Sequence, residues 1–235
     1  MENTENKRLK NTFSMLLNLS IVILSIMSLT YAFRSDIVVE DAFFNFKGFT
    51  SFRFFTNLSN LYVAVASLVM LKSNIKNAIY DTYEFPVLVS VLKFSATVAV
   101  SVTFVIVVIF LSPLVALGGR SYFTLFANNS FILHFLTPVL AIVSHMFFEE
   151  HKSFRFSFTL LGVVPTFMYS IVYLVMVVFI GESNGGWPDF YYFTFGGKLW
   201  AIPITMSLMY LLTFGLSVLL WFIQKKVQQK SLKVN

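Results

Sequence analysis

The chain has 235 residues, of which 57% are hydrophobic and only 12% are charged. Soluble domains carry about 25% charged residues, so this composition excludes a soluble globular enzyme, and we expect the bilayer to be the solvent of most of the chain. The sequence contains no Cys, which excludes disulfides, thiolate metal sites and cysteine nucleophiles. Three His without clustered carboxylates match no common metal-ligand set, so we expect neither a metal nor a cofactor.

Six apolar stretches, each near the length of about 20 residues that a spanning helix needs, predict an all-α, polytopic bundle of six transmembrane helices in a single domain. The predicted helices cover about 13–33, 54–71, 94–112, 131–148, 158–180 and 199–223. The first could also be a cleaved signal peptide, but its apolar region exceeds the usual signal length of about 7 to 15 residues. We therefore expect a retained helix.

Lys93 and several prolines mark the expected irregularities of these helices. Lys93 divides the apolar run that ends at Ser112, so the piece before it is predicted to lie at the interface as an amphipathic segment. Pro113 is expected to end the third helix. The prolines inside the later spans predict kinks, at Pro138, Pro165 and Pro203.

The distribution of basic residues predicts the orientation, because cytoplasmic loops carry the excess of Lys and Arg. One side of the predicted bundle holds 12 of the 17 basic residues, namely Lys7, Arg8, Lys10, Lys72, Lys76, Lys93, Lys152, Arg155, Lys225, Lys226, Lys230 and Lys233. Both termini are therefore expected to be cytoplasmic, in a multi-pass protein of the cell membrane. The net charge of +6 is thus a topology signal, and the expected partners are membrane lipids rather than nucleic acid.

Ionisable groups within membrane spans are functional candidates because each is costly there. The predicted hydrocarbon segments contain no Asp or Glu, which argues against an ion-coupled carrier. His145 and His151 are interpreted as interfacial residues of an inner loop.

A polar cluster opens the second predicted helix, where Thr56, Ser59 and Asn60 follow Arg53. Their i, i+3 and i+4 spacing places the three side chains on one helix face. Such residues often join helices by hydrogen bonds, so the cluster is either interhelical glue or a chemical site.

A second cluster lies in the fourth predicted helix, where His134 and Thr137 share a face next to Pro138. Pro138 has no N–H and is expected to leave the carbonyl of His134 without its helical partner. At 1.5 Å per residue, Thr56 and His134 lie roughly 3 and 5 Å below their entry points, so we expect them to meet in the outer leaflet. A hydroxyl beside an imidazole makes a nucleophile and base pair, although a lone intramembrane His is also often structural.

The loop before the last helix, residues 181–193, lies on the same predicted side and is rich in Gly and aromatic residues. It is either an aromatic belt at the membrane interface or a lid over Thr56 and His134.

Together these motifs resemble the androgen-induced, six-transmembrane threonine hydrolase family and its bacterial six-helix relatives. The matching segments are Arg53-Phe54-Phe55-Thr56, His134 with Thr137 and Pro138, Gly185-Gly186-Trp187-Pro188, and the stretch from Tyr210 to Lys225. The resemblance implies an intramembrane hydrolase of lipid esters, in which Thr56 is the nucleophile and His134 its base.

The remaining site residues are expected from their positions near this pair. Ser59, Asn60 or Asn129 would donate to the oxyanion, and Thr137 and Trp187 would line the substrate site. An orienting acid for His134 would have to come from an outer loop, where the candidates are Asp189, Glu182, Glu40 and Asp41. The alternative is a non-catalytic membrane protein, a small permease or an assembly partner, with an outer pocket for a lipid or small molecule. Nothing in the sequence indicates an oligomeric state.

Overall fold

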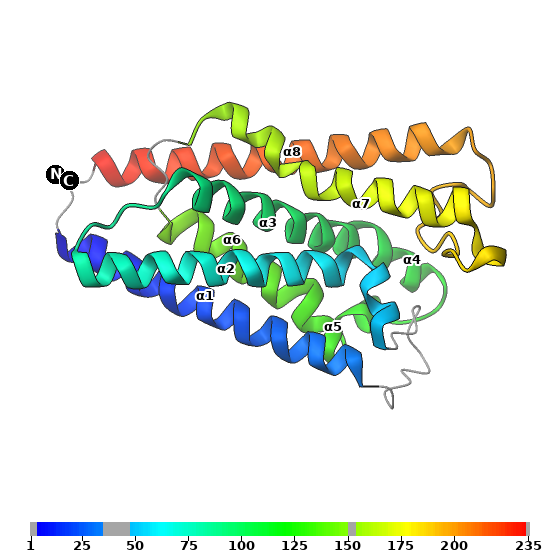
Figure 1. The fold of residues 1–235 in the computed structure, drawn as a ribbon, viewed down its shortest axis with the longest axis horizontal. Helices are drawn as coiled ribbons and strands as arrows, with labels where there is room; N and C mark the ends of the chain where they lie inside the picture. Colours follow the sequence, from blue (N-terminus) through cyan, green and yellow to red (C-terminus); the bar gives the residue numbers. More distant parts are fainter. Residues whose placement is uncertain (1–3, 35–47, 150–153, 234–235) are drawn as a thin grey trace.

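The computed structural model describes residues 4–34, 48–149 and 154–233, and in these ranges the chain is helical and has no strand. Six helical stretches are long and apolar enough to cross a membrane: Thr4–Phe33, Phe55–Tyr80, Val87–Leu117, Asn129–Phe148, Phe156–Ile180 and Ala201–Gln229. They lie roughly parallel to one another, and the start of the first stretch and the end of the last lie at the same end of the bundle (Figure 1). We call this the termini end and the other the opposite end. The predicted number of spanning helices is confirmed.

Three stretches change helix type along their length, whereas α1 (Thr4–Phe33), α2 (Phe55–Tyr80) and α8 (Ala201–Lys233) are single α-helices. The third stretch consists of α3 (Val87–Ile106), the π-helical η2 (Val107–Leu111) and α4 (Ser112–Leu117). The fourth consists of α5 (Asn129–Phe131), the π-helical η4 (Ile132–Leu136), α6 (Thr137–Val143) and the π-helical η5 (Ser144–Phe148). The fifth begins with the 3-10 helix η6 (Phe156–Gly162) and continues as α7 (Val164–Leu174) and the π-helical η7 (Val175–Ile180).

Short 3-10 segments at the opposite end connect these stretches. They are η1 (Gly48–Arg53), η3 (Tyr122–Phe126) and η8 (Glu182–Asn184).

Three prolines stand at the start of α segments that follow a change in helix type, Pro113 in α4, Pro138 in α6 and Pro165 in α7. Proline has no N–H and crowds the preceding turn, and a local change in hydrogen-bond register relieves both problems. The prediction that Pro113 ends the third helix is therefore wrong, because the helix continues to Leu117. Pro203 lies in the first turn of α8, where a missing N–H breaks no helical hydrogen bond.

Lys93 lies inside α3 and is completely buried. The segment before it belongs to the same continuous helical stretch, Val87–Leu117, so the predicted division of this stretch at Lys93 is wrong. The second helix also extends past its predicted end at Leu71, reaching Tyr80.

α3 occupies the centre of the bundle, where it packs against α2, α6 and α8, while α1 runs along α2 (Figure 1). An apolar cluster fills the space between α1, α2, α3 and α6, composed of Ile21, Val63, Ala66, Ala96, Val100 and Ala141. Near Gly162, η6 approaches α8 so closely that a Cβ atom would collide with the side chain of Ser217.

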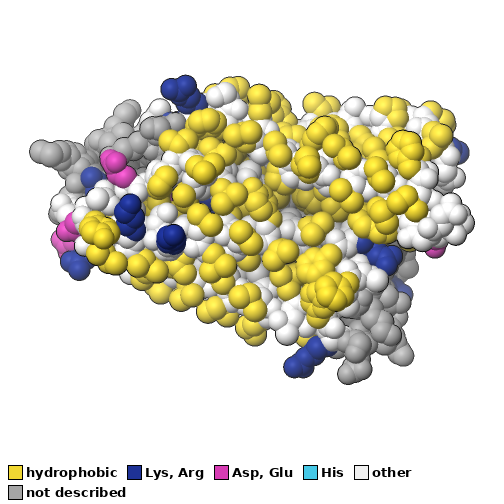
Figure 2. Space-filling model, in the orientation of Figure 1, with side chains coloured by type: hydrophobic (Ala, Val, Ile, Leu, Met, Phe, Trp, Pro, Cys, Tyr) yellow, Lys and Arg dark blue, Asp and Glu magenta, His cyan; other side chains and the backbone are white. Residues whose placement is uncertain are grey.

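Hydrophobic side chains cover the middle of the bundle, whereas Lys and Arg gather towards its two ends (Figure 2). Large apolar residues are exposed along the helices, among them Ile26, Leu68, Ile109, Phe179 and Leu211. An apolar band between charged ends is what a lipid-facing surface requires. The fold therefore indicates a multi-pass membrane protein.

Candidate functional site

Thr56 stands in the first turn of α2 at the opposite end and is half-buried. The N–H of the preceding Phe55 donates to the phenol oxygen of Tyr191 at 3.1 Å. The Asn57 side-chain amide donates to the Ser51 carbonyl at 2.9 Å and holds η1 against the start of α2. The turn that carries the Thr56 hydroxyl is thus braced from both sides.

His134 lies in the π-helical segment η4, with 9% of its surface exposed. Its Nδ1 is 2.8 Å from the carbonyl oxygen of Leu125 in η3. Because a carbonyl only accepts hydrogen bonds, Nδ1 carries the proton and Nε2 carries the lone pair. His134 is therefore held as the tautomer whose Nε2 can act as a base.

Asn60 connects the Thr56 turn to the helix of His134. Its side-chain amide donates to the carbonyl of Thr56 at 2.8 Å and to the carbonyl of Leu133 at 3.1 Å. Among the residues that the structure describes, no hydrogen bond joins the Thr56 hydroxyl to the imidazole. The two side chains are related through Asn60, across packed neighbouring segments.

The register of η4 explains why Leu133 needs this partner. The Thr137 N–H donates to the carbonyl of Ile132, five residues earlier. In the same register the next carbonyl, that of Leu133, would pair with the nitrogen of Pro138, which has no hydrogen. The sequence predicted a freed carbonyl at His134; the carbonyl that takes a side-chain donor is that of Leu133.

The three predicted oxyanion donors are already engaged with backbone carbonyls. The Asn60 amide donates to the carbonyls of Thr56 and Leu133. The Ser59 hydroxyl donates to the Thr56 carbonyl at 3.0 Å, and the Asn129 amide donates to the Ser28 carbonyl at 3.3 Å. Thr137 differs, because it is fully buried and its hydroxyl has no partner among the described residues.

The loop from Gly181 to Trp200 docks onto the start of α2. The rings of Phe54 and Phe190 lie 4.7 Å apart, and the Tyr191 phenol accepts the N–H of Phe55. Burial raises the pKa of Tyr191 to about 12, so this phenol stays neutral. Trp187 packs farther back, with its ring 6.2 Å from Tyr173 of α7. Tyr191 is therefore the loop residue that makes the hydrogen bond to the Thr56 turn.

Asp189 organises this loop. Its carboxylate accepts hydrogen bonds from the Tyr173 hydroxyl, the Phe193 N–H, and both the N–H and the hydroxyl of Thr194. Partial burial alone would raise the pKa of Asp189, but these hydrogen bonds outweigh it and hold the pKa below its ordinary value. The Asp189 carboxylate is therefore engaged in hydrogen bonds that hold the loop together and fix it to α7.

Among the described residues, the group that orients His134 is the Leu125 carbonyl, and Asp189 is bonded within its own loop. Glu182 is exposed in η8, and Glu40 and Asp41 lie outside the described residues. This role of Leu125 could not be predicted from the sequence, because every residue has a backbone carbonyl.

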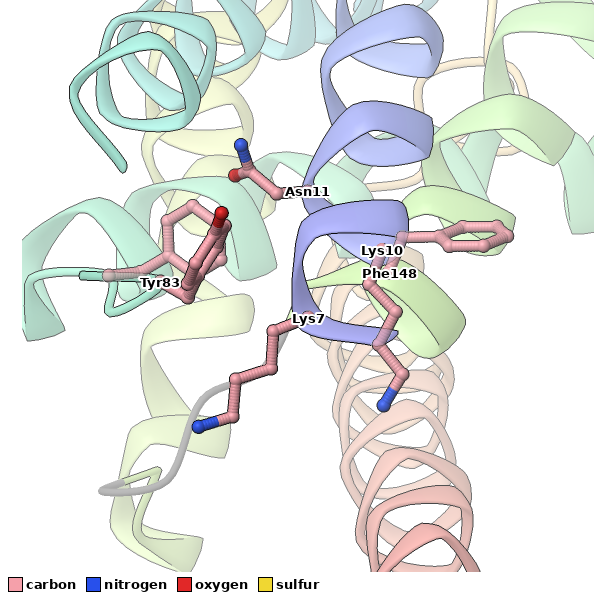
Figure 3. A pocket seen from close by; sticks show the side chains of 6 residues that line it. Lys7, Lys10, Asn11, Tyr83 and Phe148 are labelled. Atoms are coloured by element: carbon pink, nitrogen blue, oxygen red, sulfur yellow. The ribbon is translucent and has the colours of Figure 1, made fainter. Parts of the chain in front are cut away.

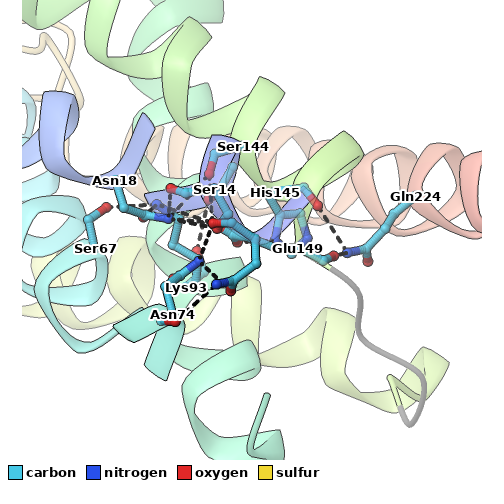
Figure 4. Close-up of polar contacts among 11 residues, drawn as sticks. Ser14, Asn18, Ser67, Asn74, Lys93, Ser144, His145, Glu149 and Gln224 are labelled. Atoms are coloured by element: carbon cyan, nitrogen blue, oxygen red, sulfur yellow. Dashed lines mark hydrogen bonds and ion pairs between the residues drawn. The ribbon is translucent and has the colours of Figure 1, made fainter. Parts of the chain in front are cut away.

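A second polar cluster, which sequence reasoning also missed, lies at the termini end and centres on Lys93 (Figure 4). The Lys93 ammonium donates to Asn18 Oδ1 at 2.6 Å and to Ser67 Oγ at 2.7 Å, and it lies 3.9 Å from Glu149 Oε1. Glu149 Oε1 also accepts from the Ser144 hydroxyl at 2.7 Å and from the Asn18 amide at 3.0 Å. α1, α2, α3 and the fourth stretch are joined through these contacts.

His145 belongs to this cluster. It is fully buried, with Nδ1 3.6 Å from Glu149 Oε2, and the Gln224 amide of α8 donates to its backbone carbonyl at 3.2 Å. The sequence placed His145 in an inner loop, and this is wrong, because His145 lies in the helical segment η5 and is buried between helices. His151 lies outside the described residues. In the described part of the chain, no three His, Asp or Glu side chains group as a metal site would require.

A groove that is open to solvent lies beside this cluster at the termini end (Figure 3). Its lining residues come from the start of α1, from the segment between α2 and α3, and from η5, and they are Lys7, Lys10, Asn11, Tyr83, Phe85 and Phe148. The Asn11 amide donates to the carbonyl of Asn74, so the wall of the groove is part of the α1–α2 contact.

Comparison of the chain with family models, curated proteins and solved structures finds no match.

Proposed function

We propose that this chain is an intramembrane hydrolase that cleaves lipid esters, with Thr56 as nucleophile and His134 as base. The observation that carries the proposal is the hydrogen bond from His134 Nδ1 to the Leu125 carbonyl, which leaves Nε2 as the basic nitrogen. Two features support the proposal: the base is held in one tautomer, and its segment η4 packs against α2, which carries the half-buried Thr56 hydroxyl.

In this mechanism the Thr56 hydroxyl oxygen attacks the ester carbonyl carbon while His134 Nε2 takes its proton. The imidazolium then protonates the leaving alkoxide, and the acyl group remains on Thr56. Catalytic hydrogen bonds often shorten only when substrate binds, and here substrate would bring the hydroxyl and the imidazole together. General-base assistance of this kind contributes about 10² to 10⁴-fold.

The proposed orientation has both termini in the cytoplasm, so that the Thr56 end faces the outer leaflet of the cell membrane. An ester would enter laterally from that leaflet. The loop held by Asp189 and Tyr191 would cover the site from the water side.

Labelling with a fluorophosphonate probe tests the proposal, because the probe reacts with activated hydroxyl nucleophiles. We expect labelling of the full chain in detergent and loss of labelling in Thr56→Val and His134→Ala. Thr205→Val is the matched control, since the hydrogen bonds of the Thr205 hydroxyl run to backbone carbonyls, those of Ala201 and Ile202 in α8 and that of Phe193 in the preceding loop. Equal labelling of all four proteins would contradict the proposal.

A proton-coupled permease is the second candidate, and the buried Lys93–Glu149 pair is the observation that favours it. The sequence argued against such a carrier because the predicted spans lack carboxylates, but Glu149 turns back into the bundle. Proton uptake into proteoliposomes that contain a pH-sensitive dye separates the candidates. A carrier moves protons with a solute and is not labelled at Thr56, whereas a hydrolase is labelled and moves none.

A further inference from the structure

A buried polar layer crosses the bundle between the proposed catalytic pair and the apolar cluster. It consists of Ser25 in α1, Asn60 in α2 and Thr137 in α6, all fully buried. Each stands three or four residues, about one helical turn, from a member of the apolar cluster: Ile21, Val63 and Ala141 respectively. Ile21, Val63 and Ala141 pack together in the apolar cluster. The three polar residues each lie one helical turn from them in the direction of the opposite end, and therefore form a common layer.

Each residue of this layer has a buried polar atom without a partner among the described residues. These atoms are Ser25 Oγ, Asn60 Oδ1 and Thr137 Oγ1. A buried threonine in a membrane helix commonly donates to the carbonyl four residues earlier, which for Thr137 is the carbonyl of Leu133. That carbonyl accepts the Asn60 amide instead, and the Thr137 hydroxyl is left for another acceptor.

The chemistry of the three atoms selects the ligand. Two hydroxyls can each donate or accept, and the amide oxygen only accepts, so the layer suits a neutral molecule that both donates and accepts. A buried water is typically held by two to four such groups. A divalent cation is usually held by one or more carboxylates together with other oxygen ligands, and the layer contains no carboxylate.

We propose that Ser25, Asn60 and Thr137 bind internal water, and that this water is the second substrate of the hydrolase. The second part of this inference rests on the proposed function. An acyl group on Thr56 must be removed by water, and Thr56 and His134 lie one turn beyond Asn60 and Thr137, so the layer places water next to them.

In the hydrolytic step, water removes the acyl group from Thr56. The water oxygen bonds to the acyl carbon while His134 Nε2 takes one water proton, and the bond between the acyl carbon and Thr56 Oγ1 breaks. The proton passes from the imidazolium to Thr56 Oγ1, which restores the hydroxyl and releases a carboxylic acid.

Radiolytic footprinting tests the water site without requiring activity, because ionised bound water oxidises the side chains next to it. In the full chain in lipid nanodiscs, we expect oxidation of Leu133, which is 4% exposed, at least several-fold above that of the buried Val98 and Val100. Thr137→Val should reduce the oxidation of Leu133. Thr97→Val is the control, because the equally buried Thr97 hydroxyl donates to the Lys93 carbonyl. Leu133 oxidised no more than the two valines would overturn the proposal.

Pre-steady-state kinetics with a nitrophenyl ester tests the role of the water. We expect Thr137→Val to keep the initial burst of nitrophenol and to slow the following steady state about tenfold, which is the effect of slower deacylation. An unchanged steady state overturns the role in deacylation. Absence of any nitrophenol release by the wild-type protein above the background rate, with positive footprinting, would instead refute the hydrolase and retain the water site.

Discussion

The ammonium group of Lys93 lies 3.9 Å from Glu149 Oε1, and neither side chain is accessible to solvent. Removing one partner of a buried ion pair leaves the other charge uncompensated, at a cost of about 3–5 kcal/mol. We therefore expect Lys93→Met and Glu149→Gln each to lower the free energy of unfolding strongly, and the double variant to lower it by much less than the sum. Unfolding of the purified protein by SDS titration measures the coupling.

Lys72→Met is the control for this cycle, because Lys72 is exposed on α2 and its replacement should leave the unfolding curve nearly unchanged. Strictly additive effects of the two substitutions at Lys93 and Glu149 would contradict an energetic role for the pair.

The Asn60 bridge predicts a selective loss of stability. Asn60→Leu keeps a similar volume but leaves the Leu133 carbonyl without its donor, and an unpaired buried polar group costs about 1–3 kcal/mol. Asn184→Leu removes a similar bond, from the Asn184 amide to the Ile180 carbonyl at 3.0 Å, at an exposed position. Thermal unfolding should show a clear decrease in Tm for Asn60→Leu alone, and equal decreases for both would refute the bridge.

Two glycines offer a matched test of the contact between η6 and α8. A Cβ at Gly162 would collide with the Ser217 hydroxyl, which donates to the Thr159 carbonyl at 2.7 Å, whereas a Cβ at Gly215 meets no atom within 4 Å. We expect Gly162→Ala to destabilise the protein by about 1–3 kcal/mol because of overpacking. Gly215→Ala should instead stabilise it by up to about 1 kcal/mol through helix propensity. The same unfolding assay compares them, and the idea fails if both substitutions are neutral.

The hydrogen bonds to Asp189 predict acid sensitivity of the loop from Gly181 to Trp200. The pKa of Asp189 is lower in the folded protein than its ordinary value of 3.8. The carboxylate thus stabilises the loop above pH 3.8, and this contribution is lost as the pH falls through the lower folded-state pKa. Fluorescence anisotropy of Trp187, in a chain with Trp200→Phe and Trp221→Phe, should fall in that acid range. Asp189→Asn should show the low value already at neutral pH, and an acid transition that persists in this variant would exclude Asp189 as its cause.

The spanning helices could be predicted from sequence because length and hydropathy are local properties of each segment. All six helical stretches were predicted, and the main errors concerned the positions at which a stretch ends or changes helix type. Pro113 was expected to stop a helix, since a proline cannot join a regular α-helical ladder. The π-helical η2 before it provides a register in which the chain continues, and no local pattern announces such a change.

Burial of charge could not be predicted in the same way. Lys93 was expected at the interface because a lone ammonium in the hydrocarbon is costly. Its partners come from α1, α2 and the end of the fourth stretch, as much as 75 positions away in the sequence. The contact between α2 and the segment of His134 was predicted from the similar depths of Thr56 and His134 in the membrane. The role of the Asn60 amide, which joins the two segments by hydrogen bonds, depends on how the helices pack and could not be predicted.

The π-helical segments also affect how this chain tolerates changes in length. A π turn closes on the fifth residue rather than the fourth, so deleting one residue from it can restore α-helical geometry and leave the following faces in place. In α2 the same deletion would rotate every later side chain by about 100° and turn Ser67 away from Lys93. Segment η7, which contains no buried residue, is therefore where the bundle can lose a residue with least damage, and single-residue gaps between related sequences should fall there.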